Sequence, residues 1–246
     1  MDITQSRSPK PGGRFTVALA GLHERWNHLR GDARRRDLDV DRTEEGRNAG
    51  LRPARSGRGV FDKRSAILRA ALRLFGSGQF HAVAVPSLAR EAGIAQGSIY
   101  NYFASKEDVA LAALRATSAA FEARMLAGLP AAGSPEEQLL AAGATLMECA
   151  ADDPTAAAFL FGARHETYLG ERAVDAYGLP AAVAFVLSAG QARGVVRSGS
   201  ASELAEIWLA VIAVGALGIV REPVRAVEIA GTITEAAFGA VRQRPY

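Results

Sequence analysis

Residues 88–103 read LAREAGIAQGSIYNYF, and this stretch is the strongest indicator of the fold. Its apolar spacing predicts a short amphipathic helix over Val85–Ala92, which ends at Gly93 because glycine readily adopts the left-handed conformation at a helix C-terminus. A second short helix is expected to begin at Gln96 and to run to Tyr102. Two short helices joined by such a turn are typical of a helix-turn-helix, whose second helix enters the major groove of DNA.

The second predicted helix has a small N-terminal end and polar side chains that suit contact with a duplex. Glycine and serine leave room for the backbone to approach, and glutamine and asparagine match the adenine edge. A lysine at the start of the following helix can meet a phosphate together with free backbone N–H groups. The candidate DNA contacts are Gln96, Gly97, Ser98, Tyr100, Asn101, Tyr102, Lys106 and Arg64. The structural alternative for each is packing within the protein, as Tyr100 would do against the first helix.

On either side of this motif, apolar residues at three- and four-residue spacing predict helices along the rest of the chain. Prolines at positions 154, 180 and 223 stand near predicted helix starts, where proline is tolerated. No sustained strand alternation is present, so we expect an all-α protein. The remaining predicted helices are Asp62–Phe75, Ser105–Leu126, Glu136–Ala151, Thr155–Phe161, Glu166–Tyr177, Ala181–Ala192, Ala201–Arg221 and Val224–Val241.

Composition and charge divide the chain into three predicted regions. Residues 1–57 are rich in Pro, Gly and mixed charges, and we expect a mostly disordered basic arm there. Residues 58–115 would form the helix-turn-helix domain, and residues 116–246 a helical C-terminal domain. Basic residues outnumber acidic ones in the first two regions and the reverse holds in the third, which fits a nucleic-acid-binding front half.

The cysteine count and the length of the apolar segments indicate a cytoplasmic protein without contact to a membrane. Cys149 is the single cysteine among 246 residues, so no intrachain disulfide can form. No signal peptide is evident, and the longest apolar run, Ile207–Val220, is shorter than a typical membrane span. Cys149 and the four histidines do not have the spacing of a zinc site, and no nucleophile stands beside a local base. We therefore expect neither metal nor cofactor, and no enzyme.

Residues 64–114 resemble the DNA-binding domain of the tetracycline-repressor (TetR) family. The strongest part of the resemblance is the stretch Tyr100–Glu107, YNYFASKE. The resemblance implies an all-helical homodimer whose variable C-terminal domain binds a small-molecule effector and supplies the dimer interface. The other matching residues are Ile67, Ala70, Leu74, Phe75, Phe80, Val85, Leu88, Ala89, Ala92, Gly93, Ile94, Gly97, Ser98 and Ile99.

The chain departs from the family pattern at the starts of both short helices. Val83 and Ala84 replace the usual hydroxyl residues before the first, and Ala95 replaces the usual serine before the second. Both helices are therefore expected to lack a side-chain N-cap, at a cost of about 1 kcal/mol each. These departures affect DNA affinity and individual contacts, not the expected fold.

The C-terminal region offers candidates for an effector pocket and for a dimer interface. His165 and Tyr168 stand three residues apart on one predicted helix and could present their polar groups together. The small and apolar faces of the helices at 201–221 and 224–241 suit a four-helix interface with a second copy. For all of these residues the alternative is a place in the subunit's own core. The candidate ligand contacts are Met147, Phe159, His165, Tyr168 and Trp208.

The sequence thus predicts a homodimeric DNA-binding transcriptional regulator, with double-stranded operator DNA and an unknown small-molecule effector as partners. A repressor that the effector releases from its operator is the leading interpretation. The alternative is a sensing or interaction module whose helix-turn-helix no longer binds a specific operator. The sequence does not distinguish repression from activation.

Overall fold

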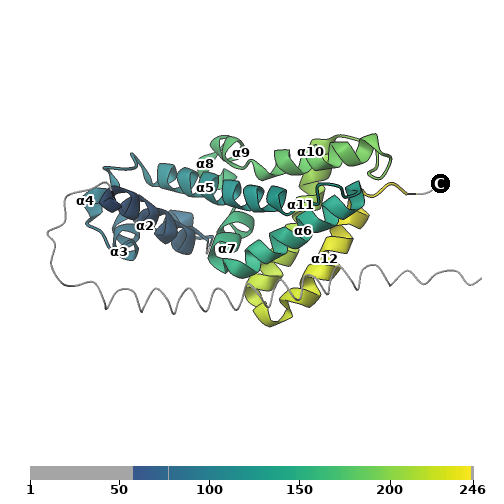
Figure 1. Ribbon diagram of the computed structural model, residues 1–246. Coiled ribbons are helices and arrows are strands. Elements are labelled where there is room, and N and C mark those ends of the chain that lie inside the picture. Colours follow the sequence, from purple (N-terminus) through teal and green to yellow (C-terminus); the bar gives the residue numbers. More distant parts are fainter. Residues whose placement is uncertain (1–57, 77, 245–246) are drawn as a thin grey trace, which may run out of the picture. The chain divides into compact units, whose positions relative to one another are not determined.

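The computed structural model describes residues 58–76 and 78–244, which are helical almost throughout (Figure 1). The all-α prediction is confirmed: within these ranges there is no β-strand, and Val196 and Arg242 form an isolated antiparallel bridge. The predicted arm, residues 1–57, lies outside the described residues. The elements in order are α2 (Arg58–Phe75), η1 (Phe80–Ala82), α3 (Val85–Glu91), α4 (Gln96–Ile99), α5 (Lys106–Ala127), α6 (Pro135–Asp152), α7 (Pro154–Gly162), α8 (Glu166–Leu169), α9 (Arg172–Ala176), α10 (Leu179–Ala192), α11 (Ala201–Arg221), η2 (Pro223–Arg225) and α12 (Ala226–Val241).

Several helices begin where side-chain capping predicts. Ser105 caps α5 by accepting a hydrogen bond from the Asp108 backbone N–H at 3.0 Å. Ser134 and Glu137 form a complete capping box at the start of α6, each side chain accepting from the other residue's backbone N–H. Because these caps satisfy N–H groups that have no partner within the helix, they fix the starts of the two helices.

Four predicted helices differ clearly in their bounds from the structure. The helix expected over Asp62–Phe75 already begins at Arg58. The helix expected over Gln96–Tyr102 ends at Ile99, and a turn follows it. The helix expected over Glu166–Tyr177 is broken into α8 and α9, because Gly170 adopts a φ of +57° that stops the first of them. The last predicted helix begins with the 3₁₀ turn η2 rather than at Val224.

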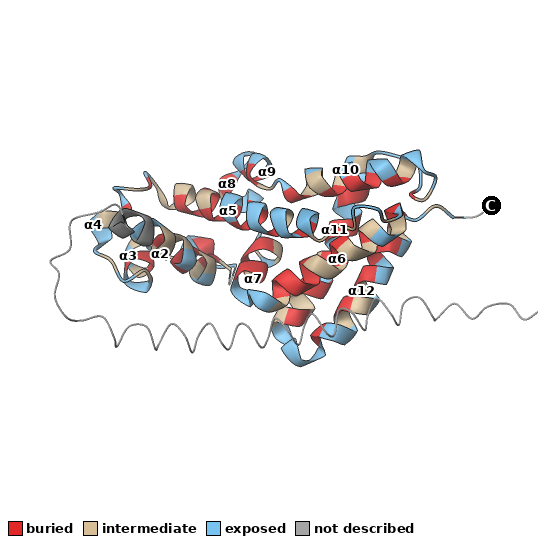
Figure 2. Ribbon diagram, viewed as in Figure 1, coloured by how far each residue is buried: buried red, intermediate tan, exposed pale blue. Residues whose placement is uncertain are grey.

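Helix α11 is the centre of the C-terminal core and packs against α6, α7, α10 and α12. Trp208 and Ile212 on its inner face have no exposed surface, and the buried stripe continues along α6 (Figure 2). A Cβ at Gly215 would lie 2.6 Å from Cγ2 of Ile233, so the glycine is what lets α12 approach α11. By length and composition α11 could also cross a membrane, and 44% of its most apolar window is buried inside the protein.

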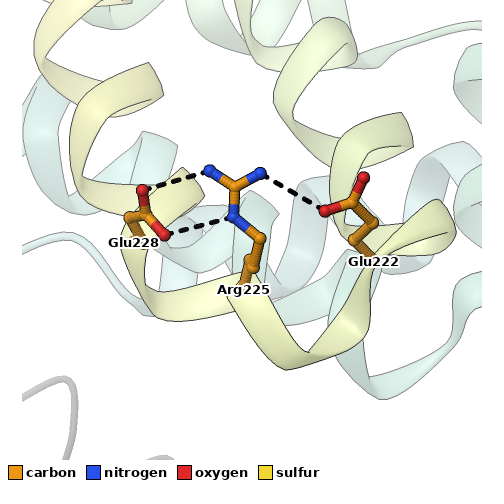
Figure 3. A network of polar contacts seen from close by, with 3 residues as sticks. All are labelled: Glu222, Arg225 and Glu228. Atoms are coloured by element: carbon orange, nitrogen blue, oxygen red, sulfur yellow. Dashed lines mark hydrogen bonds and ion pairs between the residues drawn. The ribbon is translucent and has the colours of Figure 1, made fainter.

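The corner between α11 and α12 is held by one arginine and two glutamates (Figure 3). Arg225 donates from Nε and Nη2 to both carboxylate oxygens of Glu228, at 3.2 and 3.1 Å, and from Nη1 to Glu222 at 3.3 Å. These hydrogen bonds lower the pKa of Glu228 below its ordinary value. All three side chains are well exposed to solvent, so the network orients the corner more than it stabilises the fold.

Helix α5 contacts elements on both sides of the predicted domain boundary. It packs against α2 of the N-terminal region and against α6, α9 and α10 of the C-terminal region. The predicted boundary between residues 115 and 116 falls within this helix. Arg172 of α9 also reaches back to Asp108 near the start of α5, at 2.6 Å.

Candidate nucleic-acid interface and effector cavity

The turn between α3 and α4 is built by Gly93, which has a φ of +68°. The Gly93 backbone N–H donates to the Arg90 carbonyl at 3.2 Å, and the Ile94 N–H donates to the Ala89 carbonyl at 3.0 Å. This is the double hydrogen bond of a Schellman motif, which needs a residue in the left-handed conformation. The predicted helix-turn-helix is therefore present, and its turn fixes the direction in which α4 leaves α3.

Helix α4 is anchored by its apolar side chains and leaves its polar ones available. Ile99 and Phe103 are buried, with 1% and 7% of their surface exposed. Tyr100 is 54% exposed, so the alternative in which this side chain packs into the domain is not what the structure shows. Gln96, Gly97 and Asn101 are also exposed, whereas Ser98 and Tyr102 are partly buried.

The polar side chains of this surface are not engaged in hydrogen bonds within the described part of the protein. Within the described residues, the side chains of Gln96, Ser98, Tyr100, Asn101 and Tyr102 make no hydrogen bond to another group. A Cβ at Gly97 would meet nothing within 4 Å, so the fold does not require a glycine there. The free donors and the open backbone form one exposed surface, as direct contact with a duplex requires.

The predicted absence of N-caps is confirmed for both short helices. Ala84 precedes α3 and Ala95 precedes α4, and neither start has a side-chain hydrogen bond. The first backbone N–H groups of these helices are consequently left to solvent or to a ligand.

Lys106 has a structural role beside the predicted phosphate contact. Its ammonium donates to the carbonyl oxygens of Phe80 and Val83, both at 3.0 Å, and lies 4.3 Å from the centre of the Phe80 ring. Two of its three N–H donors are therefore used to hold the segment that leads into α3. The phosphate contact through the third donor stays a prediction.

Arg64 remains available at the edge of this surface. Its side chain is exposed and its guanidinium lies 5.5 Å from the centre of the Phe103 ring, just beyond α4. Contact with an aromatic face restrains the arginine without using its hydrogen-bond donors. Arg64 therefore stays a predicted DNA contact.

A cavity of about 530 Å³ lies in the C-terminal region, open to solvent on one side. This volume is within the range of small-molecule sites. Its walls come from α5, from the segments around α7–α8 and α9–α10, and from α11. The lining residues are Leu114, Leu160, Phe161, Ala163, His165, Glu166, Ala173, Val174, Tyr177, Pro180, Ala181, Ser202, Glu206, Leu209, Ala210 and Ala213.

Of the predicted ligand contacts, only His165 lines this cavity. Met147, Phe159 and Trp208 are packed in the core, with at most 1% of their surface exposed. For these three the core alternative is correct, because apolar residues on the inner faces of helices pack against one another and do not line an open site. Cys149 is likewise core, and burial raises the pKa of its thiol to about 11.

His165 and Tyr168 bond each other rather than presenting their polar groups jointly. The Nε2 atom of His165 lies 2.9 Å from the Phe159 carbonyl, and Nδ1 lies 2.7 Å from the Tyr168 hydroxyl. Since a carbonyl can only accept, Nε2 carries the proton and Nδ1 accepts from the tyrosine O–H. Burial lowers the pKa of His165, in keeping with this neutral tautomer, and raises the pKa of Tyr168 to about 12.

Tyr168 continues the connection toward the helix-turn-helix. Its ring stacks on Phe80 with centroids 3.9 Å apart and planes 10° from parallel. Phe80 in turn contacts Phe75 at the end of α2, at 5.0 Å between centroids. An aromatic cluster thus joins the cavity wall to the segment before α3.

The residues that give the cavity its polar character could not be found from the sequence. They are Glu166 on α8, Ser202 and Glu206 on α11, and Tyr177 between α9 and α10. No spacing along the chain brings such positions together, so only the tertiary packing reveals them. His165, next to Glu166, was the nearest available signal.

The comparisons with known proteins agree with this geometry. Residues 67–113 match the family model of bacterial regulatory proteins, tetR family. The HTH-type transcriptional regulator BetI of Rhizobium meliloti (strain 1021) is 33% identical over 79 residues, which is 32% of this chain and 39% of that protein. The match thus spans about two fifths of this curated relative.

Solved structures share the fold over most of the described residues. A tetR family transcription regulator from Shewanella sp. PV-4 matches with a TM-score of 0.65 and 22% identity, over 74% of this chain and 99% of that one. The fatty acid degradation regulator FadR from Bacillus halodurans matches with a TM-score of 0.63 and 19% identity, over 78% and 100%. FadR from Bacillus subtilis, in complex with stearoyl-CoA, matches with a TM-score of 0.58 and 18% identity, over 72% of this chain and 98% of that one.

Proposed function

Because the chain belongs to the tetR family of bacterial regulatory proteins through residues 67–113, we propose that this transcriptional regulator is a repressor that a small-molecule effector releases from its operator. Two copies would place their α4 helices in successive major grooves of a pseudo-palindromic operator. An effector in the cavity would favour a dimer geometry that separates those helices. Operator affinity would then fall because the effector binds the two states unequally.

The observation that carries this proposal is the run of contacts between the cavity and the helix-turn-helix. His165 lines the cavity and accepts the hydrogen bond of Tyr168, whose ring stacks on Phe80. Lys106 at the start of α5 holds the carbonyls of Phe80 and Val83, just before α3. A ligand that displaces His165 would therefore disturb the segment that positions the DNA-contacting helices.

The proposed dimer rests on apolar side chains that the subunit leaves in solvent. Ile207 and Val214 on α11 are 42% and 68% exposed, and Val227 on α12 is 37% exposed. These are the two helices that the sequence predicts to meet a second copy. Exposed apolar residues on adjacent helices suit a self-complementary interface around a two-fold axis.

The test of the docking model is operator binding by the full chain and a Tyr100→Ala variant. Tyr100 is 54% exposed and makes no hydrogen bond or ring contact within the described residues, so its loss should leave folding intact. We expect operator affinity to fall by about tenfold or more, in line with the loss of a well-placed contact. Phe185→Ala, at a residue of α10 that is 77% exposed, is the matched control. Equal affinity of Tyr100→Ala and the unmodified chain would reject this orientation of α4.

The second candidate function is a sensing or interaction module without operator-specific binding. The uncapped starts of α3 and α4 favour it, because poorly fixed helices position side chains less accurately. Binding to genomic fragments over a range of salt concentrations separates the two. A preference for particular fragments that persists at high salt supports the repressor, and uniform, strongly salt-dependent binding supports the alternative.

The remaining assignments derive from this function. We place the protein in the cytoplasm, where its operator would be. Residues 58–115 would act as the DNA-binding domain and residues 116–246 as the effector-binding and dimerisation domain. Residues 1–57 would add non-specific phosphate contacts through their basic side chains.

A further inference from the structure

The charges that line the cavity all have one sign. Glu166 at the start of α8 and Glu206 on α11 contribute carboxylates, and no lysine or arginine among the described residues lines it. Neither glutamate has an ion-pair partner in the described part of the chain. His165, whose imidazole is the one ionisable nitrogen among the described residues of the wall, is kept neutral because burial lowers its pKa. An anion brought into this cavity would meet two carboxylates and no countercharge.

Two hydroxyl-bearing residues, Tyr177 and Ser202, and two aromatic side chains also line the cavity. Tyr177 is partly buried, lines the cavity and has no hydrogen-bond partner for its hydroxyl in the described residues. Burial, together with the nearby Glu166 carboxylate, raises its pKa, so the hydroxyl stays neutral. Phe161 presents a second aromatic side chain to the same space. Aromatic faces combined with carboxylates attract cations, and most strongly those with weakly hydrated head groups.

The rest of the lining is apolar and small. Leucine, alanine, valine and proline side chains make up most of the wall, and the cavity holds about 530 Å³. Such a lining favours a ligand with an apolar body rather than a sugar or a small ion. The ligand's charged end would lie toward Glu166 and Glu206 and its apolar body against α5 and α11.

We propose that the cavity binds an organic monocation with an apolar body, such as an alkylammonium compound. The inference rests on the proposed function only in taking this cavity as the effector site. Both glutamates are exposed to solvent, so each should contribute modestly to affinity. A factor of about two to five per carboxylate is what partly screened ion pairs provide.

The test compares ligands that share one tail and differ in head-group charge. Calorimetric titration of the full chain without DNA would use decyltrimethylammonium, 1-decanol and decanoate below their aggregation concentrations, together with decanoyl-CoA. The expected order of affinity is cation, then alcohol, then the two anions. The double variant Glu166→Gln with Glu206→Gln should bind the cation about five- to twentyfold more weakly and bind 1-decanol with unchanged affinity. Glu235→Gln, an exposed position on α12 outside the cavity, is the control variant.

Each outcome has a defined meaning. No binding of the cation, tighter binding of decanoate or decanoyl-CoA, or an unchanged cation affinity in the double glutamine variant overturns the proposal. Operator binding is measured separately with the same compounds. A cation that binds as expected but leaves operator affinity unchanged supports the ligand class and contradicts the effector-released repressor. An anion that binds more tightly and releases DNA contradicts the ligand class alone.

Discussion

Two glycines of the DNA-binding region, residues 58–115, have opposite surroundings. A Cβ at Gly97 would meet nothing within 4 Å, whereas a Cβ at Gly76 would lie 2.7 Å from the Leu72 carbonyl oxygen and 3.2 Å from the Phe159 backbone nitrogen. We expect Gly97→Ala to leave the free energy of unfolding unchanged or raise it by up to about 1 kcal/mol. Its operator affinity should fall about tenfold, since the methyl group would stand between the backbone and the duplex.

Gly76→Ala should do the reverse, lowering stability and leaving operator affinity unchanged. Its methyl group would press on backbone atoms of α2 and α7, which cannot move aside cheaply, so about 1–3 kcal/mol of stability should be lost. The fraction that remains folded should bind DNA normally. Urea unfolding and fluorescence anisotropy with labelled operator measure the two quantities. If Gly97→Ala bound DNA normally, close backbone approach at α4 would be ruled out.

Lys106 can be tested by the salt dependence of binding. Lys106→Met keeps the side-chain stem but removes the hydrogen bonds to Phe80 and Val83, and should cost about 1–3 kcal/mol of stability. If Lys106 serves only these two hydrogen bonds, the slope of log affinity against log salt stays unchanged. A slope smaller by about 1 with normal stability would instead show that the lysine contacts a phosphate.

The buried His165 makes stability depend on pH. Because burial lowers its pKa below the ordinary 6.5, the unfolded chain takes up a proton before the folded one does. Stability contributed by the neutral imidazole is therefore present above pH 6.5 and is lost as the pH falls from there through the folded-state value. One such group changes the free energy of unfolding by at most about 1.4 kcal/mol per pH unit.

His165→Gln is the control, since an amide can donate to the Phe159 carbonyl and accept from Tyr168 without titrating. Unfolding measured at pH 7.5, 6.5 and 5.5 should show a steeper loss of stability for the unmodified chain than for this variant. Parallel curves would mean that His165 does not titrate in this range.

At the scale of the helices, the uncapped start of α4 predicts that a single added hydroxyl would raise the stability of the protein. Ala95 has an extended backbone, with φ of −66° and ψ of 140°, which is the conformation of an N-cap residue. Ala95→Ser should therefore raise stability by about 0.5–2 kcal/mol. Hydrogen exchange of the α4 amides should slow accordingly. Ser105→Ala, which removes the existing cap of α5, should show a loss of similar size.

Most helices could be predicted from sequence because local signals agree with the final packing. The start of α5 follows from the capping residue Ser105, and α6 begins one residue before its predicted start at Glu136. The break between α8 and α9 was missed because Gly170 stands within apolar spacing that continues on both sides of it. α4 was predicted too long because the turn that follows it also places apolar side chains inward, as Phe103 shows.

For the protein as an assembly, the exposed apolar face of α11 predicts self-association. Val214→Glu would place a charge in the middle of the proposed interface, where Val214 is 68% exposed in the isolated subunit. We expect the unmodified chain to sediment as a dimer and this variant as a monomer with native helicity, by analytical ultracentrifugation and circular dichroism. Phe185→Glu, on α10, should remain dimeric, and a dimeric Val214→Glu would place the interface elsewhere.

The DNA-facing side of the site could be predicted from sequence, whereas the cavity could not. The polar residues of α4 lie within one short stretch, so their spacing alone places them together. The cavity draws residues from α5, α8, α9, α10 and α11, and its assembly depends on how those helices pack. Lys106 shows the same limit, because the carbonyls that it binds lie more than twenty residues away in sequence.

Since α5 runs unbroken from Lys106 to Ala127, the angular phase between its two ends depends on the number of residues between them. Each residue added to an α-helix rotates the remainder of the helix by about 100° and advances it by about 1.5 Å. One alanine inserted in the middle of α5 would point the DNA-contacting surface in a different direction relative to the cavity. Seven would nearly restore the direction while lengthening the helix by about 10 Å. A chimera that joins this DNA-binding region to another regulator therefore has to conserve helical register as well as sequence at the junction.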